Sequence, residues 1–141
     1  AQELFLNRPD KEALSLDTKD FDVSFARGLS LEDGAATLTE FTSNIIADAL
    51  NTLFEKSNNN SWKILLCGGG RKNKSLINLI KNKINKKNTI DLIDNFKING
   101  DYVESQAFAY IAIRSYLKLP ISFPKTTGCK KPCSGGLVIE N

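Results

Sequence analysis

The sequence contains no histidine and no methionine, and only three cysteines occur among its 141 residues. Cys129 and Cys133 form the pattern Cys-x-x-x-Cys in a loop that also carries a proline. A structural zinc site normally needs four ligands, and the chain has neither a histidine nor a second cysteine pair to complete one. We therefore interpret these two residues as incidental loop thiols, rather than as half of a metal site or a redox pair. Cys67, at the end of an apolar stretch, is predicted to be a small core residue.

Long hydrophobic runs are also missing. No run approaches the roughly 18 apolar residues of a membrane-spanning helix, and no signal peptide is visible at the start. The odd number of cysteines argues against a complete set of internal disulfides and favours the reducing cytoplasm. With 141 residues, 41% of them hydrophobic, the chain is long enough for one domain with its own core. Because it begins at Ala1 and lacks methionine throughout, we expect a fragment of a longer polypeptide.

The positive charge is modest but unevenly distributed. The formal net charge is +3, yet residues 71–87 contain seven basic residues and no acidic one. Such a run is compatible with a nucleic-acid surface, which would bind DNA or RNA with a steep salt dependence. The same segment has apolar residues on one helical face, few aromatics and many asparagines. A solvated lysine face is therefore the favoured interpretation, and nucleic acid is not expected as a partner.

The stretch that organises the rest of the chain is residues 62–75. Its first five residues are mostly apolar and predict a short buried strand, and Gly68, Gly69 and Gly70 follow as a turn that no side chain obstructs. Asn73 is placed to cap a helix whose apolar residues recur at helical spacing. In such a unit, backbone N–H groups can face a ligand at close range, and the positive helix end favours an anion. The glycines match neither common nucleotide-binding glycine pattern, so a short structural connection is the alternative.

Helical and extended segments alternate along the chain. A long helix with one apolar face is expected over residues 34–56, with Ser30 as its N-cap. A second short strand is predicted over residues 89–93. A further helix begins near residue 101; it is apolar on more than one side, so we expect it to be substantially buried.

The remaining segments complete the predicted architecture. Residues 136–139 predict a terminal strand after a glycine turn, and residues 1–29 an irregular lead-in. The alternating order predicts an α/β layer with parallel strands and right-handed crossovers over residues 30–141, which we expect to form a single domain. Ligands of such sheets gather at the carboxyl ends of the strands, where the glycine turn and the loop at residues 99–104 both fall.

Asp101 and Glu104 are the acidic residues with the most informative spacing. It is that of a capping box, in which Asp101 caps the helix and Glu104 reaches back to the N-cap N–H. Capping alone explains both residues. Their predicted position beside the glycine turn also suits a polar ligand, where a carboxylate holds sugar hydroxyls or orients a water bound to magnesium.

Several of these motifs together resemble the C-terminal part of the anhydro-N-acetylmuramic acid kinase family. The similarity covers nearly the whole chain in the family's order. It is most specific at Gly-Asp-Tyr-Val-Glu-Ser-Gln-Ala-Phe-Ala-Tyr, residues 100–110, and it includes Leu-Cys-Gly-Gly-Gly-Arg-Lys-Asn, residues 66–73. Further similar stretches are residues 15–17, 34–42, 119–120 and 127–128. The triple glycine is shared by many kinases of the sugar-kinase/actin ATPase superfamily.

The resemblance implies the C-terminal lobe of a ribonuclease H-like or actin-like ATPase fold, with a short, mostly parallel sheet flanked by helices. It also implies an enzyme of peptidoglycan recycling that uses ATP and Mg²⁺ to open the 1,6-anhydro ring of anhydro-N-acetylmuramic acid and form N-acetylmuramic acid 6-phosphate. By position, Gly68, Gly69, Gly70 and Asn73 would lie near the nucleotide. Asp101 and Glu104 would face the sugar.

The chain departs from the family pattern in one respect. The family's N-terminal lobe, with its phosphate-binding Asp-Gly-Thr segment and the aspartate that acts as catalytic base, has no counterpart in these residues. The isolated chain is therefore expected to be inactive, with the N-terminal kinase lobe as its partner. The alternative function is a non-catalytic binding or assembly module that keeps the kinase-lobe fold and pairs with a second copy of itself.

Overall fold

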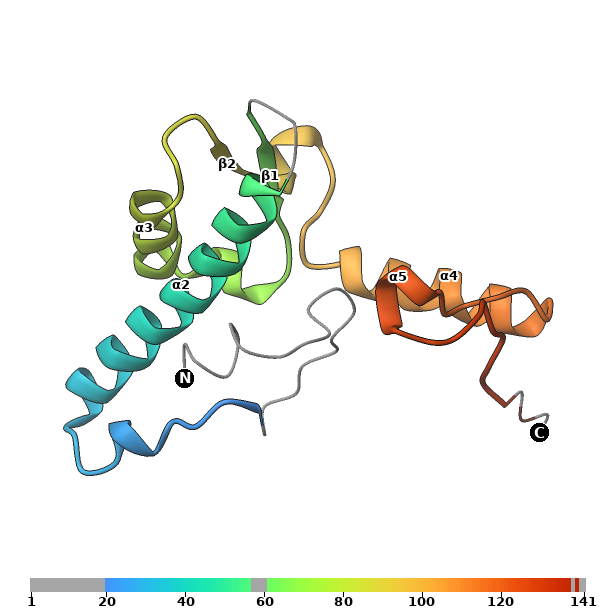
Figure 1. The fold of residues 1–141 in the computed structure, drawn as a ribbon, viewed down its shortest axis with the longest axis horizontal. Helices are drawn as coiled ribbons and strands as arrows, with labels where there is room; N and C mark the ends of the chain where they lie inside the picture. The colour runs from blue at the N-terminus through green and yellow to red at the C-terminus, as the bar shows by residue number, and fades with distance from the viewer. Residues whose placement is uncertain (1–19, 57–60, 138, 140–141) are drawn as a thin grey trace. The chain divides into compact units, whose positions relative to one another are not determined.

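The computed structural model describes residues 20–56, 61–137 and 139 (Figure 1). The chain divides into two compact units, Val23–Val103 and a second that joins Ala1–Asp22 with Glu104–Asn141. Most of the predicted lead-in, residues 1–19, lies outside the described residues. None of the described helices is both long enough and apolar enough to cross a membrane.

The first long element of the Val23–Val103 unit is the helix α2, Leu31–Glu55, which follows the short 3₁₀ turn η2, Ser24–Ala26. The Ser30 side chain accepts a hydrogen bond from the backbone N–H of Asp33 at 3.0 Å, which confirms the predicted N-cap. Glu32 and Asp33 add negative charge to the first turn, where the helix dipole favours it.

Two parallel strands form the sheet of this unit. β1, Lys63–Leu66, pairs with β2, Thr89–Leu92, in the register that places Ile64 opposite Ile90. The connection between them contains the 3₁₀ turn η3, Gly69–Lys72, and the helix α3, Lys74–Lys83. A further 3₁₀ turn, η4, Ile93–Phe96, follows β2. The predicted parallel pairing through a glycine turn and a helix is therefore confirmed.

Branched and small apolar side chains from the helices and the sheet form the core of this unit. Ala47 of α2 meets Ile80 of α3, Ile84 and Ile90 of β2, and all four side chains are at most 9% exposed. Figure 1 shows α2 and α3 lying together beside the strands. The glycine turn connects β1 to α3, and both of these elements supply side chains to the core.

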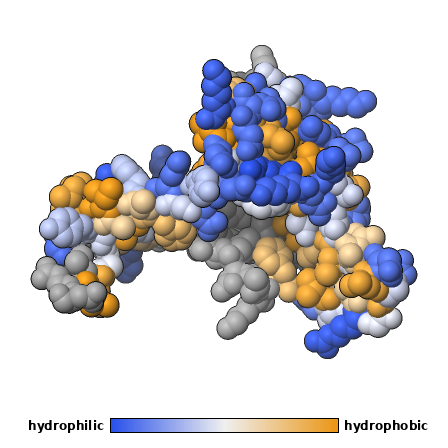
Figure 2. All heavy atoms as spheres, turned by 180° about the vertical axis from the view of Figure 1, so that it is seen from behind, coloured by the Kyte–Doolittle hydropathy of each residue, from blue (hydrophilic) through white to orange (hydrophobic). Residues whose placement is uncertain are grey.

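The helix α4, Val103–Tyr116, begins one residue before the Glu104–Asn141 segment and otherwise lies within it. The short helix α5, Pro124–Thr127, follows in the same segment. The predicted burial of α4 is wrong, because none of its residues is buried. Its large apolar residues Phe108, Tyr110, Ile113 and Tyr116 are each 60–67% exposed. Figure 2 shows apolar residues at the surface of the part of the chain that contains α4. The sequence pattern was that of a buried helix, but the described chain supplies no element to cover it.

Two smaller expectations are also corrected. The described residues of the predicted terminal strand, 136, 137 and 139, form no strand, because no neighbouring strand of the described chain pairs with them; residue 138 lies outside the description. Cys67 is exposed rather than in the core. Cys67 directly follows Leu66, the last residue of β1, so it lies where the chain has already left the sheet.

Candidate functional site

The glycine turn links the end of β1 to the start of α3. Gly68 has φ +76°, a backbone conformation that glycine adopts without strain, and its N–H donates to the carbonyl oxygen of Gly100 at 2.9 Å. A Cβ atom built on Gly68, Gly69 or Gly70 would meet no atom within 4 Å. Asn73 caps α3 as predicted, because its side chain accepts from the N–H of Leu76 at 3.1 Å. The turn is therefore open on the side that a ligand would approach.

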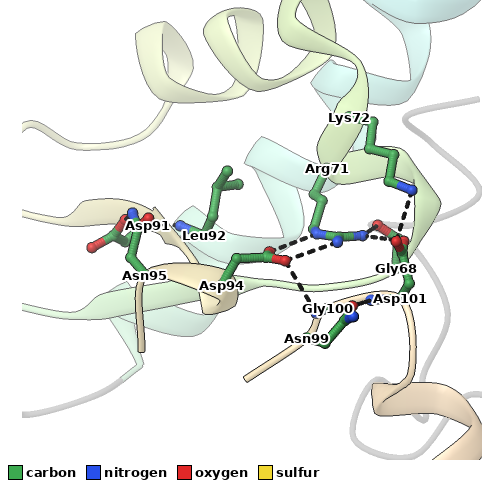
Figure 3. Close-up of polar contacts among 10 residues, drawn as sticks. All are labelled: Gly68, Arg71, Lys72, Asp91, Leu92, Asp94, Asn95, Asn99, Gly100 and Asp101. Atoms are coloured by element: carbon green, nitrogen blue, oxygen red, sulfur yellow. Dashed lines mark hydrogen bonds and ion pairs between the residues drawn. The ribbon is translucent and has the colours of Figure 1, made fainter. Parts of the chain in front are cut away.

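The Arg71 guanidinium holds this turn against two loops that follow β2 (Figure 3). Its Nε donates to Asp94 Oδ2 at 2.7 Å and its Nη2 to Asp94 Oδ1 at 3.0 Å. Its Nη1 donates to Asp101 Oδ1 at 2.7 Å and to the Gly68 carbonyl oxygen at 2.9 Å. The Arg71 side chain is only 6% exposed. A planar guanidinium suits this role, because its donors have a fixed geometry that matches carboxylate oxygens.

Two further contacts complete the arrangement, which we call the Arg71 network: Gly68, Arg71, Lys72, Asp94, Gly100 and Asp101. The Lys72 Nζ donates to Asp101 Oδ2 at 2.8 Å, and the Gly100 N–H donates to Asp94 Oδ1 at 3.3 Å. Gly100 is buried and has no room for a side chain, since an added Cβ would lie 2.5 Å from Arg71 Nε. The network thus joins the glycine turn to Asp94 and to Gly100 and Asp101, which lie more than 20 positions later in the sequence.

The ion pairs shift the acidity of both aspartates. Hydrogen bonding to Arg71 lowers the pKa of Asp94 to about 2, and hydrogen bonding to Arg71 and then Lys72 lowers the pKa of Asp101 to about 2. The same two carboxylates raise the pKa of Arg71 further above its ordinary value. Both aspartates are therefore ionised and fully paired at neutral pH, so they act as structural anions rather than as proton acceptors.

Stability should depend on pH through this pair. The pKa of each aspartate is about 2 in the folded chain and near 3.8 when unperturbed, so the unfolded chain binds more protons between these values. Their stabilising contribution is complete above about pH 5 and is lost as the pH falls towards 2. We expect the midpoint of urea denaturation to decrease as the pH is lowered from about 5 to about 3. The variant with both Asp94→Asn and Asp101→Asn should show a flatter dependence, and an equally steep one would contradict this assignment.

The structure brings most of the predicted site residues together but not all of them. Gly68, Gly69, Gly70, Asn73 and Asp101 all belong to the Val23–Val103 unit, and Asp101 reaches the glycine turn through Arg71. Their roles toward a ligand stay predictions.

The predicted capping box is wrong. α4 begins at Val103, and both carboxylate oxygens of Asp101 bind basic side chains of the glycine turn instead of the helix N-terminus. Glu104 lies exposed in the first turn of α4 and belongs to the other unit. The ion pairs with Arg71 and Lys72 outweigh the weaker capping bond that Asp101 would make.

Sequence reasoning missed Arg71 and Asp94. The sequence analysis treats Arg71 as part of the basic run and assigns no role to Asp94. A signal is present, since an arginine shortly after one strand and an aspartate shortly after its neighbour lie near the same edge of a parallel sheet. Opposite charges at that edge predict an ion pair.

A shallow hollow lies beside the start of α3. It is lined by small and polar residues of α2 and by the first residues of α3, including the N-cap: Ala35, Ala36, Thr37, Thr39, Glu40, Asn73, Ser75 and Leu79. All of them belong to the Val23–Val103 unit. Asn73, the N-cap of α3, lines the hollow, whereas Gly68, Gly69 and Gly70 do not.

The basic run is partly neutralised. Arg71 and Lys72 pair with the aspartates described above, and the Lys83 Nζ contacts the Glu40 carboxylate and donates to the buried Ser43 hydroxyl at 2.8 Å. Three of the seven basic residues between 71 and 87 are therefore paired with acids from other segments. This leaves less unpaired positive charge for a nucleic acid than the sequence alone indicates.

No group of three or more metal-binding side chains occurs among the residues that the structure describes. Cys129 and Cys133 are free cysteines in the loop after α5. The backbone of Cys133 forms an isolated antiparallel β-bridge with that of Ser122. The Thr127 hydroxyl, and after it the Ser122 hydroxyl and the Cys133 side chain, lower the pKa of the Cys129 thiol. The Cys129 thiol is therefore surrounded by hydrogen-bonding side chains of its own loop.

Fold and site together define an α/β protein whose short parallel sheet ends in an open glycine turn at the start of a helix. A family model described as "Anhydro-N-acetylmuramic acid kinase" matches residues 11–141. The anhydro-N-acetylmuramic acid kinase of Pelagibacter ubique (strain HTCC1062) is 47% identical over 137 residues, which are 97% of this chain and 36% of that protein. The protein of the same name from Zymomonas mobilis (strain ATCC 31821) is 40% identical over 138 residues, 98% of this chain and 35% of that protein.

The chain therefore belongs to the anhydro-N-acetylmuramic acid kinase family. It spans about a third of the length of the curated relatives that it matches.

Proposed function

We propose that this chain is the C-terminal portion of an ATP-dependent anhydro-N-acetylmuramic acid kinase and that its glycine turn contacts the nucleotide. In this proposal the Val23–Val103 unit is part of the C-terminal lobe of a ribonuclease H-like or actin-like ATPase fold. The observation that carries it is the open glycine turn, held by Arg71 just before the start of α3.

The residues of this surface fit a nucleotide. The three glycines have no Cβ atoms, so a ligand can approach the backbone closely, and α3 directs its positive end toward the same place. Lys72 is 64% exposed beside the turn, with its Nζ paired to Asp101. The small residues Ala35, Ala36 and Thr37 leave space on the neighbouring face of α2 for a flat group.

In the proposed reaction, water attacks the anomeric carbon of the anhydro sugar and the released sugar oxygen accepts the γ-phosphoryl group of ATP. This chain binds and orients the nucleotide, and Glu104 contacts the sugar. Closure of the cleft between the two lobes of the kinase aligns the reactants and excludes water. The catalytic base belongs to the remainder of the kinase. No Mg²⁺ ligand is assigned to this chain, because Asp94 and Asp101 are already paired with Arg71.

Gly69→Val tests the proposal. A Cβ atom added at Gly69 meets no atom within 4 Å, so we expect the variant to fold with an unchanged melting temperature. It would, however, fill the space through which the nucleotide approaches. We expect isothermal titration with magnesium-ATP to show at least a roughly tenfold loss of affinity, with a smaller loss for Gly69→Ala. The isolated chain should bind ATP without phosphorylating the anhydro sugar.

Unchanged ATP affinity in a folded Gly69→Val variant would refute the nucleotide site. Turnover by the isolated chain would refute the assignment of the base to the remainder of the kinase. If the folded chain binds no ATP at all, the second candidate function is favoured: a non-catalytic binding or assembly module. The observation behind that candidate is the exposed apolar surface of α4.

A further inference from the structure

The loop that carries Cys129 and Cys133 is closed by backbone hydrogen bonds of its own. The Cys133 N–H donates to the Ser122 carbonyl oxygen at 3.1 Å. The Cys133 carbonyl oxygen accepts from the N–H of Ser122 at 3.2 Å and from that of Ile121 at 2.9 Å. These residues all belong to the Glu104–Asn141 segment. The bridge therefore holds Cys133 opposite Ser122 through contacts that are internal to the loop.

The short helix α5 turns the chain back toward this bridge. Gly128 ends the helix with φ +72°, a left-handed conformation that glycine adopts without strain. The Thr127 hydroxyl contacts the Ser122 hydroxyl across the loop. Cys129 directly follows Gly128 in the sequence, so the turn returns it to the side of the bridge on which Ser122 lies.

The two thiols are consequently neighbours. The Cys133 side chain is one of the groups that hydrogen-bond to the Cys129 thiol, together with the hydroxyls of Thr127 and Ser122. Hydrogen bonds to the thiolate favour the charged form, so the pKa of Cys129 is lowered. A thiolate is the form that attacks a disulfide, and a second thiol within reach can then displace the first product.

We propose that Cys129 and Cys133 are a redox pair that a low-molecular-weight disulfide oxidises to an intramolecular disulfide. The Cys129 thiolate attacks one sulfur of the small disulfide, which forms a mixed disulfide and releases one small thiolate. The Cys133 thiol then gives its proton to solvent, and its sulfur attacks Cys129 Sγ. This closes the bond between the two cysteines and releases the second small thiolate, so the pair is oxidised by two electrons and the small disulfide is reduced to two thiols.

This proposal departs from the interpretation of the two cysteines as incidental loop thiols. That interpretation follows from the sequence, in which the pattern Cys-x-x-x-Cys shows no contact between them. The structure adds the backbone bridge and the hydroxyl contacts that bring the thiols together. The proposal does not depend on the proposed function, because it involves none of the residues of the glycine turn.

Oxidation of the full chain by oxidised glutathione tests the pair. The starting variant is Cys67→Ser, which leaves only Cys129 and Cys133. We expect it to lose both thiols and two hydrogen atoms, to retain no glutathione, and to recover both thiols in dithiothreitol. With Cys133→Ser added, the mixed disulfide on Cys129 should persist. With Cys129→Ser added instead, the first step should be at least about tenfold slower. Thiol titration and mass spectrometry follow each step.

Peptide mapping of the oxidised wild-type chain keeps the test valid if Cys67→Ser does not fold. Digestion with trypsin and mass spectrometry should find Cys129 and Cys133 joined and Cys67 outside this bond. Reduction before digestion should abolish the joined peptide.

Thr127→Val tests whether the loop causes the reactivity of Cys129. Removal of the hydroxyl should raise the pH at which the reaction with oxidised glutathione is half-maximal, and should slow it at neutral pH by about twofold or more. Thr126→Val is the matched control. The Thr126 hydroxyl donates to the Phe123 carbonyl oxygen at 3.1 Å, as that of Thr127 does at 3.2 Å, but Thr126 is not one of the Cys129 neighbours named above. It should react like the wild type.

Four results would overturn the redox pair. They are failure of the thiols to react, a mixed disulfide that persists although both cysteines are present, a disulfide between two chains, and the same half-maximal pH for Thr127→Val and the wild type. None of them bears on ATP binding by the glycine turn, which the Gly69→Val titration judges separately.

Discussion

Gly100→Ala should lower the melting temperature of the Val23–Val103 unit by roughly 5–10 °C. The added Cβ would lie 2.5 Å from Arg71 Nε and 2.7 Å from Arg71 Cζ, closer than heavy atoms approach without a bond. A flexible arginine normally moves aside at little cost. Here it is 6% exposed and bonded to Asp94, Asp101 and the Gly68 carbonyl oxygen, so any movement breaks the Arg71 network. Differential scanning calorimetry measures the effect.

A double-mutant cycle shows whether the clash acts through Arg71. In an Arg71→Ala background the guanidinium is absent, so Gly100→Ala should cost little more than Arg71→Ala alone. Gly70→Ala is the matched control, because its Cβ meets no atom within 4 Å, and it should leave the melting temperature almost unchanged. Additive effects of the two substitutions would show that Gly100 is needed for a reason other than space for Arg71.

The parts of the fold that sequence predicted well are those decided by local chemistry. Ser30 and Asn73 are capping residues directly before apolar residues at helical spacing, and both caps form. The glycines at 68–70 end one strand where a helix must begin, and the parallel pairing of β1 with β2 follows from that connection. The two caps and the glycine turn each depend on residues within a few positions of one another, and a single connection then brings β1 beside β2.

The features that the sequence did not predict depend on distant residues. Arg71 meets Asp94 and Asp101 across 23 and 30 positions, and no local pattern shows which acid a given arginine will find. The spacing of Asp101 predicts a helix cap, because it reflects only the nearest N–H groups and not the basic residues 29 and 30 positions earlier. Cys67 was placed in the core because an apolar run does not show where the strand leaves the sheet.

The prediction that α4 is buried is wrong for a different physical reason. An apolar helix pattern records what the helix contacts in the assembled protein, and this chain spans only about a third of its relatives. The pattern is typical of a buried helix, yet none of the residues of α4 is buried in the described part of the chain. By contrast, α3 carries a similar apolar face, and α2 and the sheet cover it within this chain.

The glycine turn depends on the core of its unit as well as on the Arg71 network. Ile80 of α3 is 2% exposed and packs with Ala47, Ile84 and Ile90 in the core of the Val23–Val103 unit. Ile80→Ala should lower the free energy of unfolding by about 2–5 kcal/mol, because it removes buried methyl groups and leaves a cavity. That is a large fraction of the roughly 5–15 kcal/mol typical of whole proteins. Urea denaturation followed by fluorescence measures it.

The chain's single tryptophan suits this measurement, because Trp62 stacks on Phe54 with ring centroids 5.9 Å apart, directly before β1. Leu53→Ala is the control: Leu53 is 57% exposed, and its truncation should change stability by no more than about 0.5 kcal/mol. A small effect of Ile80→Ala would mean that α3 does not depend on its packing against α2 and the sheet. A large one would mean that the start of α3, and with it the glycine turn, is positioned by this core even without the rest of the kinase.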